Sequence, residues 1–242
     1  MIQARLRHGT TQWDMPERFY DTKGMNDQSA LLWRDDSPPL SPAGGGGAAA
    51  HGGGVWFFGG GRNQGSVDFQ LAHSNNSGAS WTGGLALPDV PPPPAPQPGK
   101  DLTPQPITNA FRAATTSTTS SATTTTNGSS SISGGGSLFF GMDAGGAESA
   151  LWRSDDDGIT WHDTGGRTAG RHTTFFPANA SSGDASSSSS ASAAIHGLGG
   201  KLSNIQGFMP AVTSLDGGVT YGKAYRLPFP ALGSNQRPCV YR

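Results

Sequence analysis

The feature that most constrains the fold is a short turn that occurs three times. It reads SDDDGITW at residues 154–161, SNNSGASW at 74–81 and SLDGGVTY at 214–221. The aspartate or asparagine oxygen of such a turn can accept hydrogen bonds from the turn's own backbone N–H groups, and its glycine can take a positive φ. The final aromatic residue can pack between sheets. We therefore expect one structural brace per unit of a repeat protein.

Short apolar or alternating runs around these turns predict four strands per unit. For the second unit we expect strands at residues 108–113, 137–143, 149–154 and 160–165. The first unit repeats them at 29–34, 55–61, 69–74 and 80–83, and the third at 172–177, 195–200, 209–214 and 220–225. Residues 237–242 open a fourth unit. Four strands with the turn between the third and fourth is the pattern of propeller blades.

Low-complexity segments interrupt the units, and the Gly, Pro, Ser and Thr bias of the 242-residue chain is concentrated in them. These inserts are residues 37–54, 88–100, 114–136 and 178–194. Three of the four fall between the first and second strands of a unit, where longer loops cost little more closure entropy. The opposite end of the units, formed by second-to-third turns and unit-to-unit connections, is free of those three inserts and is where we expect a ligand site.

The turn resembles the Asp-box, or bacterial neuraminidase repeat, of the sialidase superfamily. SDDDGITW matches the box at every defined position, and stretches such as FPALGSNQRP look like sialidase-like proteins of bacteria and algae. The resemblance implies an all-β, six-bladed β-propeller, of which residues 1–242 would form a partial domain with three blades and the start of a fourth. The expected box residues are Ser74, Asn76, Gly78 and Trp81, then Ser154, Asp156, Gly158 and Trp161, then Ser214, Asp216, Gly218 and Tyr221.

The resemblance also implies what a site would contain. Retaining sialidases hold the substrate carboxylate with arginines and use an aspartate as acid/base and a tyrosine, assisted by a glutamate, as nucleophile. Guanidinium suits a carboxylate because its planar fork gives paired hydrogen bonds. By the strand register, the arginines expected on the insert-free end are Arg18 in the loop before the first unit, Arg62 in a second-to-third loop, and Arg171 and Arg237 where a new unit begins.

Other arginines end first strands and point to the opposite end, namely Arg34, Arg112 and Arg242. The AFRA stretch around Arg112 therefore differs from the family's Phe-Arg-Ile-Pro motif in position as well as in lacking Ile-Pro. Acid/base candidates are Asp14, Asp21 and Asp27, with Asp143 behind them, although each could equally be a solvated or turn-capping carboxylate. Candidates for sugar hydroxyl contacts are His172, Lys201, Asn204, Asn235 and Gln236. No Tyr/Glu pair can be assigned, since no tyrosine accompanies Glu148.

The composition of the chain gives no support for a nucleic-acid or membrane partner. A net charge of −1 and a pI near 6.6 give no footprint for nucleic acid or an anionic membrane. No apolar run approaches the roughly 18 residues of a membrane span, and the start lacks the apolar core of a signal peptide. The sequence therefore does not indicate a cellular compartment for the protein. The lone Cys239 excludes an internal disulfide, and the six histidines show no ligand spacing, so we expect no metal or cofactor.

Three functional hypotheses follow. The first is a sialidase-like glycoside hydrolase that removes a terminal acidic sugar from a glycan, monomeric when its propeller is complete. The second is a non-catalytic Asp-box propeller that binds a glycan or protein partner. The third is an assembly or sorting propeller. Three units cannot close a ring, so we expect the isolated chain to be a fragment with weak or no activity.

Overall fold

The computed structural model describes residues 2–6, 9–19, 26–36, 54–63, 66–86, 106–113, 136–145, 148–178, 194–200, 203–233 and 238. Within these residues every regular element is a β-strand. The strands form three four-stranded antiparallel sheets, each in plain chain order, and one two-stranded hairpin. The prediction of an all-β chain is therefore confirmed for this part of the molecule.

The sheets follow one another along the chain. The first contains β3 (Asn26–Asp35), β4 (Gly54–Asn63), β5 (Ser66–Ser74) and β6 (Thr82–Ala86). The second contains β7 (Pro106–Ala113), β8 (Ser137–Gly145), β9 (Glu148–Ser154) and β10 (His162–Ala169). The third contains β11 (Thr174–Pro177), β12 (Ile195–Leu198), β13 (Phe208–Ser214) and β14 (Tyr225–Pro230). The hairpin pairs β1 (Ile2–Gln3) with β2 (Glu17–Arg18).

The fourth strand of each sheet begins later than the sequence predicts. We expected these strands from residues 80, 160 and 220, whereas they begin at Thr82, His162 and Tyr225. The reason lies in the turn: the N–H of Thr160 donates to Asp156 Oδ1 at 2.8 Å, and Trp161 Nε1 donates to the carbonyl of Gly158 at 3.1 Å. The end of the motif belongs to the turn, and the sheet ladder starts only after it.

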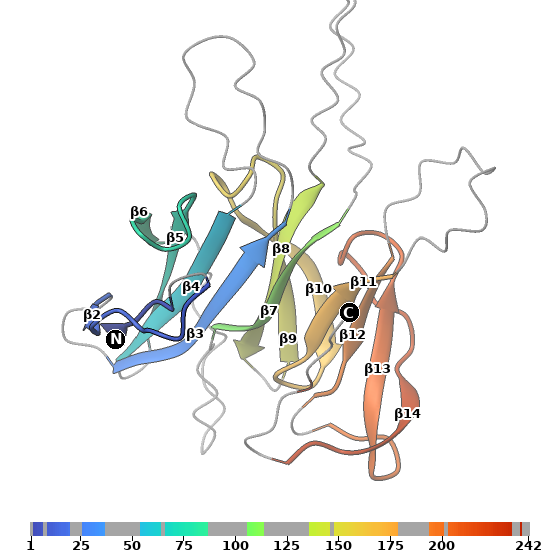
Figure 1. Cartoon of the computed structure of the whole chain (residues 1–242). Helices are drawn as coiled ribbons and strands as arrows, with labels where there is room; N and C mark the ends of the chain where they lie inside the picture. Colours follow the sequence, from blue (N-terminus) through green and yellow to red (C-terminus); the bar gives the residue numbers. More distant parts are fainter. Residues whose placement is uncertain are drawn as a thin grey trace, which may run out of the picture.

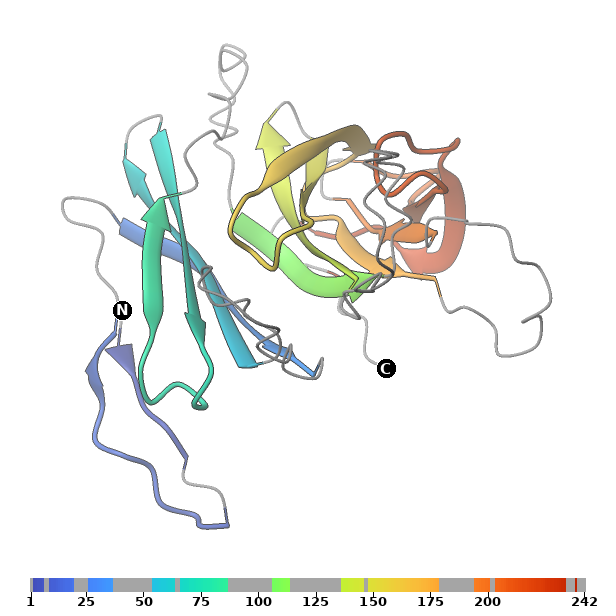
Figure 2. The same ribbon diagram turned by 90° about the horizontal axis from the view of Figure 1, so that it is seen from above.

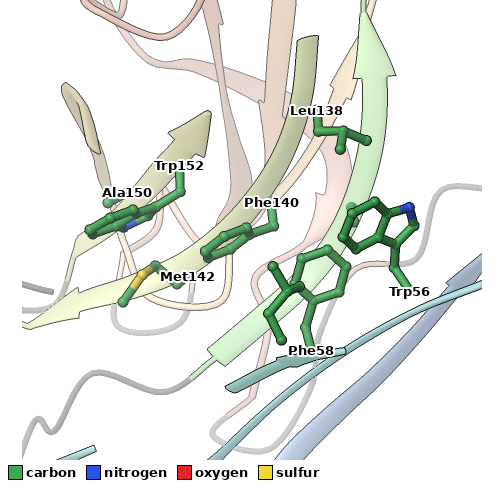
Figure 3. Close-up of a cluster of buried hydrophobic side chains, with 9 residues drawn as sticks. Trp56, Phe58, Leu138, Phe140, Met142, Ala150 and Trp152 are labelled. Atoms are coloured by element: carbon green, nitrogen blue, oxygen red, sulfur yellow. The ribbon is translucent and has the colours of Figure 1, made fainter. Parts of the chain in front are cut away.

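The second sheet is buried on both faces, since it packs between the first and third sheets. Successive side chains of its strands point to opposite faces and so enter different cores. Phe140 of β8 belongs to a cluster shared with Trp56 and Phe58 of the first sheet (Figure 3). Its neighbour Phe139 belongs to a cluster shared with Phe175 of the third sheet. Neither Phe139 nor Phe140 is exposed to solvent. Two apolar cores thus hold three sheets together.

The first strands of the three sheets lie next to one another. Strand β3 contacts β7, and β7 contacts β11. Asn109 of β7 accepts a hydrogen bond at Oδ1 from the N–H of Phe175 in β11 at 3.0 Å, and its Nδ2 donates to the carbonyl of Phe175. Figures 1 and 2 show the sheets side by side in chain order. The arrangement gives the molecule one end that carries the three repeated turns and an opposite end.

Candidate functional site

All three repeated turns, called boxes below, have the same hydrogen bonds. Each serine hydroxyl donates to the side-chain oxygen two residues later, at 2.9 Å in the first box, 2.8 Å in the second and 2.7 Å in the third. The same hydroxyl accepts from the N–H of the box glycine at 2.8, 2.7 and 2.8 Å. The glycines have φ values of 83°, 84° and 95°, a region that other residues rarely adopt. The predicted brace is observed in every sheet.

The acceptor differs between the boxes. In the second and third, partial burial opposes ionisation of Asp156 and Asp216, but hydrogen bonds from the threonine hydroxyl, the threonine N–H and the serine outweigh it. The pKa of both carboxyls is therefore held below its ordinary value. Asn76 fills this place in the first box without a charge. Its Oδ1 accepts from the N–H of Ser80 at 2.8 Å, and its Nδ2 donates to the Ser80 hydroxyl at 2.7 Å.

Each box after the first also contacts the preceding sheet. A Cβ atom added to Gly158 would lie 2.4 Å from Cη2 of Trp56 in the first sheet. One added to Gly218 would lie 2.8 Å from Cδ2 of Leu151 in the second. The Gly218 carbonyl accepts hydrogen bonds from Thr164 Oγ1 at 2.9 Å and from the N–H of Gly166 at 3.1 Å. The boxes therefore join neighbouring sheets, and glycine is required there for close approach as well as for its φ.

The box aromatics pack as predicted. Trp161 contacts Phe58 of the first sheet and Phe140 of the second, with ring centroids 6.0 and 4.9 Å apart. Tyr221 packs against the core that holds Phe175, at 6.1 Å between ring centroids. Burial raises the pKa of the Tyr221 hydroxyl, which makes this tyrosine poorly suited to ionise as a nucleophile.

A buried ion cluster lies at the box end, between the first two sheets. Arg112 at the end of β7 donates from Nε and Nη2 to Asp35 Oδ2, at 2.9 and 2.7 Å, and from Nη1 to the carbonyl of Gly136 at 2.8 Å. Its Nη1 also lies 2.8 Å from Asp157 Oδ1 in the second box. Burial opposes the charge of Arg112, yet the two carboxylates outweigh it and raise its pKa. As predicted, Arg112 belongs to the end opposite the candidate ligand site, where it locks two sheets.

A second buried cluster lies at the opposite end, where the sequence predicts ligand contacts. Arg171, in the connection between β10 and β11, donates from Nε to Oδ2 of Asp143 in β8 at 3.0 Å, and its Nη2 lies 2.8 Å from the same oxygen. The N–H of His172 donates to Asp143 Oδ1 at 2.8 Å. The side chains of Asp143, Arg171 and His172 are 2%, 7% and 9% exposed. This group, the Asp143 cluster, is our candidate site.

His172 is unusual in two ways. Its φ is 61°, a backbone region that costs free energy for a residue other than glycine and that occurs often at functional sites. Its Nε2 lies 3.3 Å from Asp143 Oδ2, close but not aligned as a hydrogen bond, and both ring nitrogens are buried without a hydrogen-bonded partner in the described part of the chain. The imidazole can therefore still donate or accept a hydrogen bond.

Electrostatics decide the role of Asp143. Its burial raises the cost of a negative charge, but His172 and Arg171 outweigh that cost and hold the pKa of Asp143 below its ordinary value. A carboxyl that stays ionised near neutral pH cannot supply a proton to a leaving group. In this arrangement Asp143 positions Arg171 and His172, and the acid/base role that the sequence allowed for it is not favoured.

The other predicted site residues are scattered or lie outside the described structure. Asp14 lies 3.5 Å from Arg5 within the hairpin. Arg18 is exposed on β2, and the neighbouring Phe19 packs against Trp81 of the first box, with ring centroids 4.9 Å apart. Asn204 caps a turn by accepting from the N–H of Gly207 at 2.9 Å. The structure therefore does not bring these three residues to the Asp143 cluster by any described contact.

Two candidates are described only as strand backbone: Asp27 pairs with Gly61, and Arg62 pairs with Asn26 inside the first sheet. Arg62 thus belongs to β4 and not to the loop in which we expected it. The remaining candidates lie outside the described residues, and these are Asp21, Lys201, Asn235, Gln236 and Arg237.

The sequence interpretation missed the ion cluster at Asp35, Arg112 and Asp157. Part of its signal was present: repeat symmetry makes Arg112 equivalent to Arg34, and Asp35 directly follows Arg34, so Asp35 and Arg112 lie near the same end of adjacent first strands. Across the described ranges, no group of three His, Cys, Asp or Glu side chains could hold a metal ion. The same residues contain no helix long and apolar enough to cross a membrane.

Comparisons with known proteins found a likeness in structure alone. Neither a protein-family model nor a curated protein matches the chain. Among solved structures, a protein of unknown function from Dyadobacter fermentans is similar, with a TM-score of 0.52 and 14% identity. The match covers 95% of this chain but 58% of that protein, so the chain spans less than two thirds of its length. A likeness at this identity concerns the fold alone.

Proposed function

We propose that this chain is part of an Asp-box β-propeller of the sialidase-like kind. One observation carries the proposal: three successive four-stranded sheets each place a fully hydrogen-bonded box between their third and fourth strands. The adjacency of β3, β7 and β11 supports it, because the first strands of propeller blades surround a common axis.

The activity that we propose is hydrolysis of a terminal acidic sugar, bound at the end opposite the boxes. The Asp143 cluster supports this choice. It concentrates an arginine and a histidine with hydrogen-bonding capacity at that end, and arginine recognises a carboxylate through paired, charge-assisted hydrogen bonds. In this proposal Asp143 holds Arg171 in place, while catalytic groups come from residues outside the described structure.

The test is turnover of a fluorogenic sialoside by the full-length protein that contains this chain. We expect Arg171→Ala and Arg237→Ala to lower kcat/KM at least about 30-fold, the scale of losing a charge-assisted contact. Arg34→Ala is the matched control, since its salt bridge with Asp36 is highly exposed at the box end. Circular dichroism of each variant separates lost activity from lost folding. No turnover of acidic or neutral glycosides by the folded full-length protein that contains this chain would sink the hydrolase proposal.

A second candidate is a propeller that binds an acidic glycan without cleaving it. The observation that favours it is that Asp143, the carboxyl paired with Arg171, has its pKa held below its ordinary value and so supplies no proton for cleavage. Calorimetric titration of a sialoside into the full chain tests it directly. Binding that is weakened by Arg171→Ala, with no turnover, would support this candidate over the hydrolase.

A further inference from the structure

A row of three buried polar side chains crosses the second sheet and includes Asp143. The register pairs Asp143 of β8 with Ser149 of β9, and Ser149 with Thr168 of β10. These strands are neighbours in the sheet (Figure 1), and directly opposed residues of neighbouring strands share one face. The three residues are 2%, 1% and 3% exposed. The Asp143 cluster is therefore continuous with two buried hydroxyls.

This polar row is a departure from the repeat. Counted from the box serine, Asp143 and Ser149 take positions that hold other residue types in the neighbouring sheets. The equivalents are Gly60 and Phe69 in the first sheet and Gly200 and Met209 in the third. A buried polar group costs free energy unless it is hydrogen-bonded, so the repeat alone gives no reason for polar side chains here. Their hydrogen bonds show which part of the chain they hold.

The hydroxyls converge on residues 170–173, which connect β10 to β11. Ser149 Oγ donates to the carbonyl of Gly170 at 3.0 Å and accepts from the N–H of Thr173 at 3.1 Å. Thr173 Oγ1 donates to the same carbonyl at 3.1 Å and lies 2.9 Å from Thr168 Oγ1. A carbonyl oxygen has two lone pairs and each hydroxyl has one proton, so Thr168 can donate to Thr173 while the other two donate to Gly170. We call Ser149, Thr168 and Thr173 the hydroxyl network.

The third sheet confines the same connection from its other side. A Cβ atom added to Gly170, whose φ is 128°, would lie 2.5 Å from Ser203 Oγ and 2.6 Å from Cα of Gly200. Arg171 and His172 lie between the two fixed residues 170 and 173. His172 has a φ of 61°, a conformation that persists only where the surrounding structure imposes it. The hydroxyl network supplies part of that constraint.

We propose that Ser149, Thr168 and Thr173 are positioning residues of the acidic-sugar site. They fix the backbone of the connection so that the guanidinium of Arg171 and the N–H of His172 both meet Asp143. Each of the three is at most 3% exposed, so each acts through the Gly170 carbonyl or the Thr173 N–H and not by contact with a ligand. An arginine that is held in place before binding loses less conformational freedom when it binds a carboxylate. The ligand is the one proposed above, so this role rests on that function.

Amide hydrogen exchange in the full-length protein, resolved to single residues by NMR, tests the positioning. Ser149→Ala removes the acceptor of the Thr173 N–H. The N–H of His172 bonds to Asp143 and to none of the three hydroxyls, so it reports whether the loss is transmitted. We expect exchange at both residues to accelerate at least about tenfold, the scale of one lost hydrogen bond, with unchanged rates in the first sheet. Acceleration at Thr173 alone, or equally in all sheets, would overturn the proposal.

A pair of substitutions at Thr173 separates hydrogen bonding from packing. Thr173→Val keeps the shape of the side chain and loses the hydroxyl, whereas Thr173→Ser keeps the hydroxyl and loses the methyl group, which lies close to Gly197. We expect faster exchange at His172 in the valine variant and nearly wild-type exchange in the serine variant. The reverse order would show a packing role and would overturn the proposal.

Thr164→Val is the matched control at the box end of the same strand. Thr164 Oγ1 lies 2.9 Å from the carbonyls of Leu151 and Gly218, so its loss removes a comparable hydroxyl far from the connection along β10. The exchange rate at His172 should not change in this variant. A change as large as that in Ser149→Ala would contradict a role specific to the hydroxyl network.

Sialoside kinetics of the same variants relate the hydroxyl network to the ligand. Loss of binding that is equal in the ground state and the transition state raises KM and leaves kcat unchanged. A variant that is only less folded has a lower apparent kcat at an unchanged KM. We expect Ser149→Ala to raise KM about tenfold at constant kcat, and the opposite result would overturn the positioning role. Absence of turnover in the wild-type protein removes the hydrolase, whereas the exchange rate at His172 still decides whether the network positions the connection.

Discussion

Because Gly158 lies close to Trp56, the free energy of unfolding that is lost when alanine replaces this glycine can be worked out from the structure. An alanine at residue 158 would place its Cβ 2.4 Å from Cη2 of an indole that is 1% exposed. Gly207 is the matched control, because its φ of 81° is nearly that of Gly158, 84°, and nothing lies within 4 Å of its added Cβ. The two sites share a backbone conformation, but Gly158 is buried against Trp56 whereas Gly207 is exposed.

The left-handed backbone alone costs an alanine roughly 1–2 kcal/mol, and this penalty applies at both positions. Overpacking adds roughly 1–3 kcal/mol at residue 158 because the indole has no room to move. For a chain of this size, that difference lowers Tm by about 2 to 12 °C more in Gly158→Ala than in Gly207→Ala. Urea denaturation gives the free energy of unfolding for both variants.

A double-mutant cycle sharpens this prediction. Trp56→Leu makes space for the new methyl group, so Gly158→Ala should cost less in that background than in the wild type. Equal destabilisation by Gly158→Ala and Gly207→Ala, or a cycle with no coupling, would refute the idea that the box glycine is required for contact between the sheets.

Two further predictions concern charges. Replacing Arg112 by methionine removes the guanidinium that pairs with Asp35, whose side chain is 1% exposed, and should cost about 3–5 kcal/mol in urea denaturation. Arg34→Ala should cost less than about 1 kcal/mol, and similar losses in both variants would contradict a stabilising contact between the sheets through Arg112. The folded pKa values of Asp156 and Asp216 are lowered, so their stabilisation is present above the unfolded pKa of about 4 and is lost as the pH falls through the folded values. Asp156→Asn and Asp216→Asn should therefore flatten the fall of Tm with acidification, and an unchanged acid slope would contradict this reasoning.

The fold was predictable to the level of strands and their grouping because each unit carries the same local signals. The runs around Phe57, Phe139 and Val212 alternate or are continuously apolar, and a box follows every third strand. The starts of the fourth strands were not predictable. A fourth strand starts where backbone N–H groups begin to bond to the neighbouring strand and no longer to a side chain of the turn. The N–H of Thr160 bonds to the Asp156 side chain, and the amino-acid sequence alone does not reveal this choice.

The positions of Arg171 and His172 along the sheets were predictable, but their burial against Asp143 was not. Repeat counting put Arg171 and His172 at the insert-free end of the sheets, where they lie. Their burial against Asp143 depends on where β8 and β9 turn relative to the next connection, a register that a single sequence leaves open. The same limit applies to Arg62, which an extension of β4 moved from a loop into a strand.

The contact of each box with the preceding sheet also bears on how the chain folds during synthesis. The first sheet can form its own ladder as soon as β6 leaves the ribosome, but Trp56 and Phe58 are covered only when residues 154–161 and the rest of the second sheet arrive. The aromatic face of each unit therefore stays exposed until the next unit has been synthesised. Chaperones that hold apolar surface would engage the nascent chain in a periodic way, once per box.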